Sequence, residues 1–411
     1  MSKVHLRVSQ WLIGALTVGA CCVGGAADAG KSDQSYRQTL SEMEEATALG
    51  RRHASLGSYA QAETFHRRAL GIAERSPGEN KPRLARILSD LAASCYYQGK
   101  YAEAETLYTR ALAIREETLG AGHPGTASIV NNLAALYHSQ GRYAEAEVLY
   151  RKALAVTEQR LGPEHPELAV MLNNLAELQT RRSRFLSAEP LLRRSIAILE
   201  KMRGGNDLSL VPSLRTLARL YKDLGYYDKA ESLYQRALAI LESAAGPAHP
   251  EIALILHNLA DLHGRQNNLA LVENLLLRTL EIWEKAPERQ DDKFAAAMHD
   301  LGRLYAIQRE FRKAQPLLER ALAIRETTAG ADDPELQPAL QDLAETYAAQ
   351  RQYEKAELLY GRLLAIQQKT FGPRHPEYAA SMERYEFLLR KLKRRPPEPR
   401  RSAFVAGRGA F

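Results

Sequence analysis

The sequence predicts an all-α protein made of stacked helical hairpins, and two observations carry this prediction. An aromatic or leucine side chain recurs every 42 residues, at Tyr59, Tyr101, Tyr143, Phe185, Tyr227, Leu269, Phe311 and Tyr353. Each interval also holds two blocks of apolar residues at helical spacing, separated by a short turn such as Gly141-Arg142. Eight copies of this kind predict that each hairpin, a first helix and a second helix, covers the apolar face of the next.

Residues 1–29 have the pattern of a signal peptide. Basic Lys3 and Arg7 precede an apolar run that begins at Trp11, and small residues around Asp28 match a cleavage site. The apolar run holds 17 uncharged residues, at the lower limit for crossing a bilayer, so an uncleaved anchor is an alternative. A cleaved leader predicts that the body of the protein lies outside the cytoplasm.

The leader contains a second cleavage pattern. Val18-Gly19-Ala20-Cys21 resembles the bacterial lipoprotein box, in which cleavage before the cysteine leaves a thiol that carries lipid. On this pattern the signal is 1–20 and Cys21 is the lipidation site. Both patterns predict an exported protein, either in the bacterial periplasm or held by lipid on the membrane face toward the periplasm.

The eight copies fill residues 30–390. Alanine recurs where the two helices of a hairpin must approach closely, as at Ala104 and Ala146 and again at Ala111 and Ala153. Linkers between copies have the form LGAGHP, in which glycine ends one helix and proline opens the next.

The residue before the linker proline is His in four linkers, whereas Asp207 and Asp333 stand at or near the same place in two others, which favours a helix cap over a metal ligand.

The sixth copy departs most from the pattern, so we expect it to be locally looser or bent. Helices near residues 34–56 and 377–392 have atypical sequences and are expected to cap the two ends.

The skeleton Leu133-Ala134-x-x-Tyr137, Ala146-x-x-x-Tyr150, Ala153 resembles the tetratricopeptide repeat, and the 42-residue form with LG-x-x-HP linkers is similar to the repeats of kinesin light chains. The resemblance covers roughly residues 40–390. It implies a right-handed superhelical solenoid of about eight hairpins plus a C-terminal capping helix. It further implies that the first helices line a concave groove in which an extended segment of a partner protein lies.

A polar position precedes the buried leucine of each first helix. The resemblance places asparagines there against a bound peptide backbone, and an amide can both donate to and accept from that backbone. The candidate groove residues are therefore Asn132, Asn174 and Asn258. The alternative is a solvated column, or one that bonds between helices.

Three cations of the fifth copy, Arg215, Arg219 and Lys222, share one helix face and could hold a carboxylate of the partner. Acids on neighbouring copies offer the alternative that these cations form ion pairs of little energetic value.

Several classes of function are disfavoured. The net charge is +7, but residues 30–389 carry only −1, which argues against nucleic-acid binding. No phosphate loop, nucleophile elbow or zinc motif is present, so the sequence predicts no catalysis and no cofactor. His257 and His299 share a column, but the spacing of helices puts them too far apart for one metal ion. Cys95 stands in a core column and is expected to be an inert thiol.

Residues 391–411 form a basic, proline-rich tail, which we expect to be disordered and which could touch anionic lipid. The sequence as a whole favours a non-catalytic scaffold that binds a protein or peptide partner. Two alternatives remain open: a structural protein that associates with itself, and an accessory subunit of an enzyme that acts on polysaccharide. The sequence does not give the oligomeric state.

Overall fold

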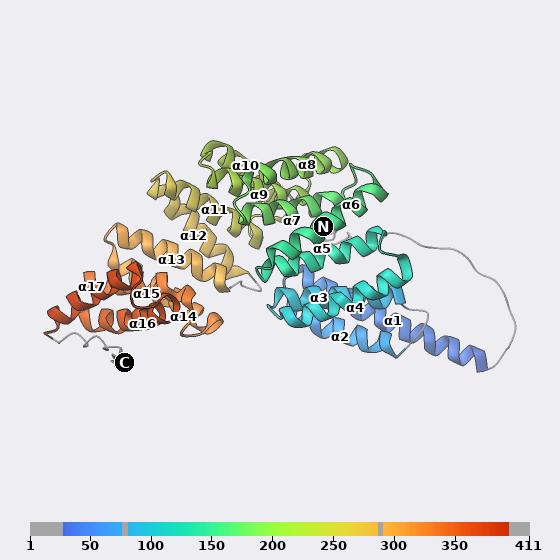
Figure 1. Cartoon of the computed structure of the whole chain (residues 1–411), viewed down its shortest axis with the longest axis horizontal. Coiled ribbons are helices and arrows are strands. Elements are labelled where there is room, and N and C mark those ends of the chain that lie inside the picture. Colours follow the sequence, from blue (N-terminus) through green and yellow to red (C-terminus); the bar gives the residue numbers. More distant parts are fainter. Residues whose placement is uncertain (1–27, 76–80, 287–290, 394–411) are drawn as a thin grey trace, which may run out of the picture. The chain divides into compact units, whose positions relative to one another are not determined.

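The computed structural model describes residues 28–75, 81–286 and 291–393 (Figure 1). Side chains are described from residue 37 onward. Within these ranges it contains 17 α-helices, two short 3₁₀ turns and no strand, which confirms the predicted all-α stack of hairpins. The expected leader, apart from its last two residues, and the tail from residue 394 lie outside the described residues. The chain divides into two compact units, and the boundary between them in the sequence lies between Pro247 and Ala248.

The first unit contains the first five copies. Each copy is a hairpin of a first and a second helix: α1 (Asp28–Ser55) with α2 (Tyr59–Glu74), α3 (Lys81–Tyr97) with α4 (Tyr101–Leu119), α5 (Pro124–Ser139) with α6 (Tyr143–Leu161), α7 (Glu167–Arg181) with α8 (Phe185–Arg203), and α9 (Val211–Asp223) with α10 (Tyr227–Ala245). A 3₁₀ turn, η1 (Leu208–Leu210), precedes α9.

The second unit contains the last three copies and one more helix. The hairpins are α11 (Pro250–Arg265) with α12 (Leu269–Lys285), α13 (Asp291–Ile307) with α14 (Phe311–Ala329), and α15 (Gln337–Ala349), preceded by η2 (Pro334–Leu336), with α16 (Tyr353–Phe371). The predicted C-terminal cap is α17 (Pro376–Lys391), whose Leu388 and Leu389 are buried. In the sixth copy α12 ends early, at Lys285, and residues 287–290 of its linker lie outside the described ranges.

The recurring alanines hold the helices of each hairpin close together, as predicted. Ala104, Ala111, Ala146 and Ala153 are fully buried, as are their described counterparts in other copies. Two copies have glycine in another close-packed column. A β-carbon on Gly302 would lie 2.8 Å from Cγ of Leu318, so the helices of the seventh copy approach even more closely. Small side chains therefore set the distance within each hairpin.

The linkers behave as the sequence predicts. Gly120, Gly162, Gly204, Gly246, Gly330 and Gly372 each end a second helix with a positive φ, which costs glycine nothing. The polar residue that follows caps the next helix: Nδ1 of His123 accepts from the amide of Gly125 at 3.0 Å, and Oδ1 of Asp333 accepts from that of Glu335 at 2.7 Å. His165, His249 and His375 accept in the same way, so the linker histidines are caps.

The first helices lie on the inner side of each stack. In the first unit, neighbouring first helices contact one another from α1 to α9, and in the second unit α13 contacts α15. Neighbouring second helices within the described residues make no contact of comparable extent. Because the inner side of a curved stack has the shorter spacing, each unit curves toward its first helices.

Candidate binding surface on the first helices

The predicted asparagines of the first unit lie on the inner side of the stack. Asn132 on α5 and Asn174 on α7 are half-buried, each one position before a buried leucine. Asn132 has no hydrogen-bond partner among the described residues, and Nδ2 of Asn174 only reaches Oδ1 of Asn131 at 3.4 Å. Their amides therefore retain donors and acceptors for a ligand. Thr216 continues the column but is buried and bonded to the carbonyl of Pro212.

Asn258 lies in the second unit, apart from the other two asparagines along the chain. Its Nδ2 donates to the carbonyl of Leu254 at 2.7 Å, one turn earlier on α11. The next two positions in its column are acids that bind histidines: Nε2 of His257 lies 2.7 Å from Asp300, and Nε2 of His299 lies 2.8 Å from Asp342. Each histidine thus lies beside a carboxylate of the next copy.

The predicted cations of α9 do not all lie on the surface. Arg215 is half-buried and has no partner among the described residues, and Arg219 lies 3.2 Å from Glu177 of α7. Lys222, in contrast, is only 6% exposed and has an interaction partner. Lys222 occupies the last turn of α9, next to the hairpin turn. Helical periodicity alone places its side chain on the exposed face, but the fold buries it there.

A histidine that the sequence analysis did not consider lies beside these cations. Burial lowers the pKa of His138 on α5, and Arg181 and Arg219 lower it further, while Glu177 opposes them. These four side chains come from α5, α7 and α9, so three neighbouring first helices contribute to one polar region. One signal for this region is visible in the sequence: His138 and Arg181 both lie in the last turn of their helices.

A second unpredicted feature links successive hairpins. A glutamate at one position of the second helix accepts hydrogen bonds from the next copy, either from the end of its first helix or from its hairpin turn. Oε2 of Glu63 lies 2.6 Å from Nζ of Lys100, Glu105 accepts from Tyr137 at 3.0 Å, and Glu147 accepts from Gln179 at 3.0 Å. Glu189 and Glu273 accept from Tyr221 and Tyr305 in the same way.

Cys95 belongs to the structure of the second hairpin. The thiol is buried, and burial, with Glu103 and Glu63 adding to it, raises its pKa to about 12. Glu63, Cys95 and Glu103 lie close enough to suggest a metal site, but Glu63 is already bonded to Lys100, Arg67 and Gln98. The cluster is therefore an ion-pair network over an inert thiol, as predicted for Cys95.

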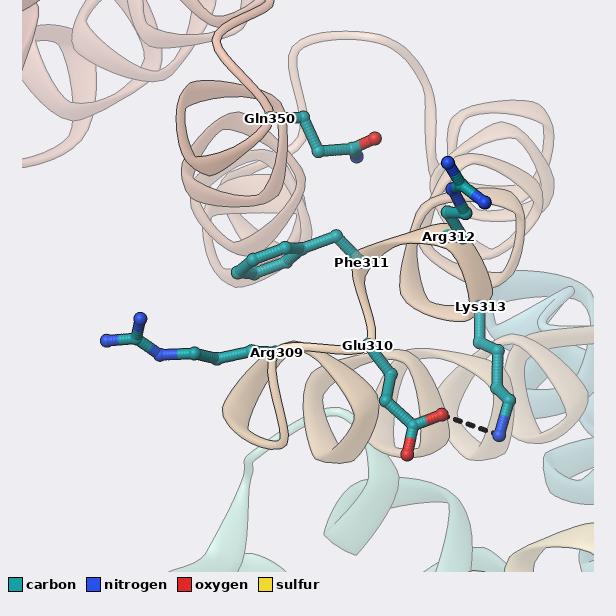
Figure 2. A pocket seen from close by; sticks show the side chains of 6 residues that line it. All are labelled: Arg309, Glu310, Phe311, Arg312, Lys313 and Gln350. Carbon is teal, nitrogen blue, oxygen red and sulfur yellow. Dashed lines mark ion pairs between the residues drawn. The ribbon is translucent and has the colours of Figure 1, made fainter.

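Two cavities of the described residues lie away from the asparagines, in the second unit. One, of about 540 Å³, is open to solvent and is lined by the turn between α13 and α14 together with Gln350 (Figure 2). Its charged residues are partly engaged, because Lys313 pairs with Glu310 at 2.5 Å, whereas Arg309 points away from both. The other, of about 590 Å³, lies between α15 and α17 beside Phe387 and Arg384. Neither encloses a constellation of catalytic groups.

Comparison with known proteins adds the family of the repeats. Models described as tetratricopeptide repeat match residues 42–117, 84–159, 125–201 and 209–285, and a second form with the same description matches 294–335 and 339–377. No curated protein matches the sequence. Among the described residues, none of the helices combines the length and apolarity needed to cross a bilayer.

Solved structures with similar folds come from several organisms. A signal-transduction ATPase with a tetratricopeptide repeat sensor from Pyrococcus horikoshii has a TM-score of 0.59 at 16% identity, over 81% of this chain and 50% of that one. The apo quorum sensor NprR from B. thuringiensis has a TM-score of 0.57 at 15% identity, over 83% and 94%. Repeats of a putative kinesin light chain from Podosopora anserina are 27% identical, over 50% and 97%, with a TM-score of 0.43. At these identities the first two likenesses concern the fold alone.

Proposed function

Because the chain belongs to the tetratricopeptide repeat family, we propose that it is a non-catalytic scaffold that holds an extended peptide segment of a partner protein along its first helices. The observation that carries this proposal is the row of incompletely bonded polar groups on neighbouring first helices of the first unit. Among the described residues, Asn132 has an amide without a partner, Asn174 a weakly bonded amide, and Arg215 a guanidinium without a partner. Such a row suits a peptide backbone with an acidic side chain, and it needs no cofactor.

Site-specific photocrosslinking in intact cells tests the proposal. A photoreactive amino acid placed at Asn132 or Asn174 should give discrete adducts with a partner protein. The same amino acid at Arg68 or Lys152, which are exposed on second helices, serves as the control. Adducts that form equally well from the control positions would place the partner elsewhere and contradict the proposal.

The partner segment identified in this way can then be measured directly. Its affinity for purified protein should fall about tenfold or more when Arg215 is replaced by Glu, because the substitution reverses a charge that faces the ligand. Lys152→Glu makes the same change of charge on a second helix and should leave the affinity unaltered. Equal affinities for the two variants would remove Arg215 from the binding surface.

The leader supports a proposal about location: the protein acts in the bacterial cell envelope, either free in the periplasm or held to the membrane by lipid on Cys21. The basic tail could add contact with anionic lipid. Fractionation of cells should place the protein with periplasmic or membrane markers, and metabolic labelling with an alkyne fatty acid should be lost in Cys21→Ser if the cysteine is lipidated. Recovery with cytoplasmic markers alone would refute export.

A further inference from the structure

The second copy carries two arginines where other copies have mostly apolar or small side chains. Arg86 lies on the first helix α3, and its counterparts are Glu44, Ser128, Val170, Pro212, Leu254, Ala296 and Pro338. Arg115 lies on the second helix α4, and its counterparts are Ala73, Thr157, Leu199, Leu241, Trp283, Arg325 and Gln367, all buried except Arg325. The second copy alone has arginine in both columns. The repeat therefore does not require these two charges.

Among the residues that the structure describes, neither arginine has a hydrogen-bond or ion-pair partner. Arg86 and Arg115 are both half-buried, and Nε of Arg115 is enclosed with no hydrogen-bond acceptor. Asp90, the carboxylate that acts on Arg86, is bonded to Arg51, whose Nε and Nη2 both donate to Oδ2 of Asp90 at 2.8 and 2.6 Å.

Arg115 lies near enough to Arg86 to affect its pKa. Burial lowers the pKa of Arg86, and Arg51, Arg115 and Arg83 lower it further, with Asp90 alone opposing them. Burial lowers the pKa of Arg115, and no carboxylate opposes it. Arginine does not lose its proton in proteins, so both side chains stay charged. Their lowered pKa values mean that these two charges destabilise the folded protein. An anion that entered the site would remove this cost.

We propose that Arg86 and Arg115 form a subsite for a carboxylate side chain of the bound peptide segment. Arg86 lies one helical turn before Asp90, so it shares the inner face of α3 along which the segment is proposed to run. Guanidinium groups bind carboxylates through paired N–H donors, and both arginines have donors without an acceptor among the described residues. This inference takes its occupant from the proposed function, but the site itself rests on the two arginines alone.

Nuclear magnetic resonance of the arginine side chains in the full chain tests the subsite. The probe is the acetylated, amidated tripeptide Glu-Glu-Glu, with Gln-Gln-Gln as its uncharged match and inorganic phosphate as a small anion. At low salt, Glu-Glu-Glu should shift the Nε–H resonance of Arg115 saturably, and Gln-Gln-Gln should not. Arg86→Gln should reduce this shift strongly. Arg325→Gln, which alters the same column in the seventh copy, should leave it unchanged.

A second measurement separates binding from a structural role. Replacing Arg115 with Leu, the residue at Leu199 and Leu241, should raise Tm in the absence of ligand, because an unpaired half-buried charge is removed from a column that is otherwise buried. In the same variant, Glu-Glu-Glu should no longer shift the Nε–H resonance of Arg86. A lower Tm would mean that Arg115 supports the fold, and the proposal would fail.

Two further outcomes would also overturn the inference. Equal shifts with the acidic and amide peptides would show that charge is not recognised. A response to phosphate without a response to Glu-Glu-Glu would show a site for small ions only. Neither outcome touches the crosslinks expected from Asn132 and Asn174, so the subsite can fail while the scaffold function stands.

Discussion

At each hairpin turn one residue adopts the left-handed backbone conformation, and the side chain at that position decides its cost. Glycine fills it in four copies, at Gly57, Gly99, Gly141 and Gly225, but the other four have Ser183, Asn267, Arg309 and Arg351 at φ values between 57° and 63°. Asparagine tolerates this conformation because its short side chain can hydrogen-bond to the nearby backbone. Arginine has no such local hydrogen bond to offset the steric strain. The last two copies therefore carry backbone strain that the early copies avoid.

Replacing Arg309 with Gly should raise the free energy of unfolding by about 0.5–1 kcal/mol, because the strain of a β-carbon at positive φ exceeds the extra flexibility of glycine in the unfolded chain. Arg351→Gly should act alike. Urea unfolding measures both. The control is Arg312→Gly (Figure 2), the second residue of α14, which should lower the free energy of unfolding by up to about 0.5 kcal/mol because glycine is the poorer helix former. Losses in all three variants would contradict the assignment of strain.

At the scale of elements, the contacts between hairpins include the glutamate column as well as apolar side chains. Burial alone would raise the pKa of Glu63, but hydrogen bonds from Lys100, Arg67 and Gln98 outweigh it and lower the pKa to about 2. Glu105 and Glu147 also have lowered pKa values, because bonds from the next copy outweigh the effect of burial. The ionised glutamates thus hold successive hairpins together.

This column predicts acid sensitivity with a definite sign. Glu63 has a lower pKa in the folded than in the unfolded chain, so its stabilising contribution is complete above pH 4.5 and is lost as the pH falls toward 2. The loss should be about 1–3 kcal/mol for this residue, since its cationic partners are half-exposed. Urea unfolding of Glu63→Gln should show a shallower pH dependence than the wild type. Glu164→Gln, which alters an exposed pair, should follow the wild type.

Close packing within a hairpin predicts opposite effects for two helical glycines of the second unit. A methyl group on Gly302 would meet Leu318 at 2.8 Å, and Leu318 is fully buried, so Gly302→Ala should lower the free energy of unfolding by about 1 kcal/mol despite better helix propensity. Gly361 has nothing within 4 Å, so Gly361→Ala should raise it by about 0.5–1 kcal/mol. Calorimetry that found both variants stabilised would show that the seventh hairpin can open to admit a methyl group.

Periodicity predicted what repeats within each copy and missed what depends on contact between copies. The alanine columns, the glycine ends and the His123 cap follow from local rules and are confirmed. The hydrogen bonds of the glutamate column join successive copies, so they depend on how far each hairpin is rotated relative to the one before it. The length of the sequence repeat does not determine that rotation. The burial of Lys222 was missed because a helical wheel ignores the turn that covers the end of α9. The proposed binding residues remain a prediction, since no ligand contact has been measured.

At the scale of the whole molecule, each hairpin packs mainly on its immediate neighbours within a compact unit. Stability in such an array is close to a sum of local terms, so damage at one end should spread only a short way. In the second unit the cap α17 covers α16 through Leu388, which is 1% exposed, whereas the adjacent Phe387 is 47% exposed.

Hydrogen exchange should show this limited spread. Leu388→Ala should lower the opening free energy of α17 and α16 by about 2–4 kcal/mol, because it leaves a cavity in the terminal interface, with little change in α11 and α12. Phe387→Ala should change exchange in α17 only slightly. Faster exchange throughout the second unit after Leu388→Ala would mean that it unfolds as one cooperative body.

The linkers have a genetic consequence. Each second helix from α4 to α10 ends on a glycine of nearly the same φ, and a histidine, proline or aspartate within the next few residues opens the following copy. Recombination between two neighbouring linkers would add or remove 42 residues. Every remaining linker would still have a glycine that ends one helix and a residue that opens the next. The gene can thus lengthen or shorten by whole copies with little structural penalty, whereas a deletion of any other size would break the register of every contact beyond it.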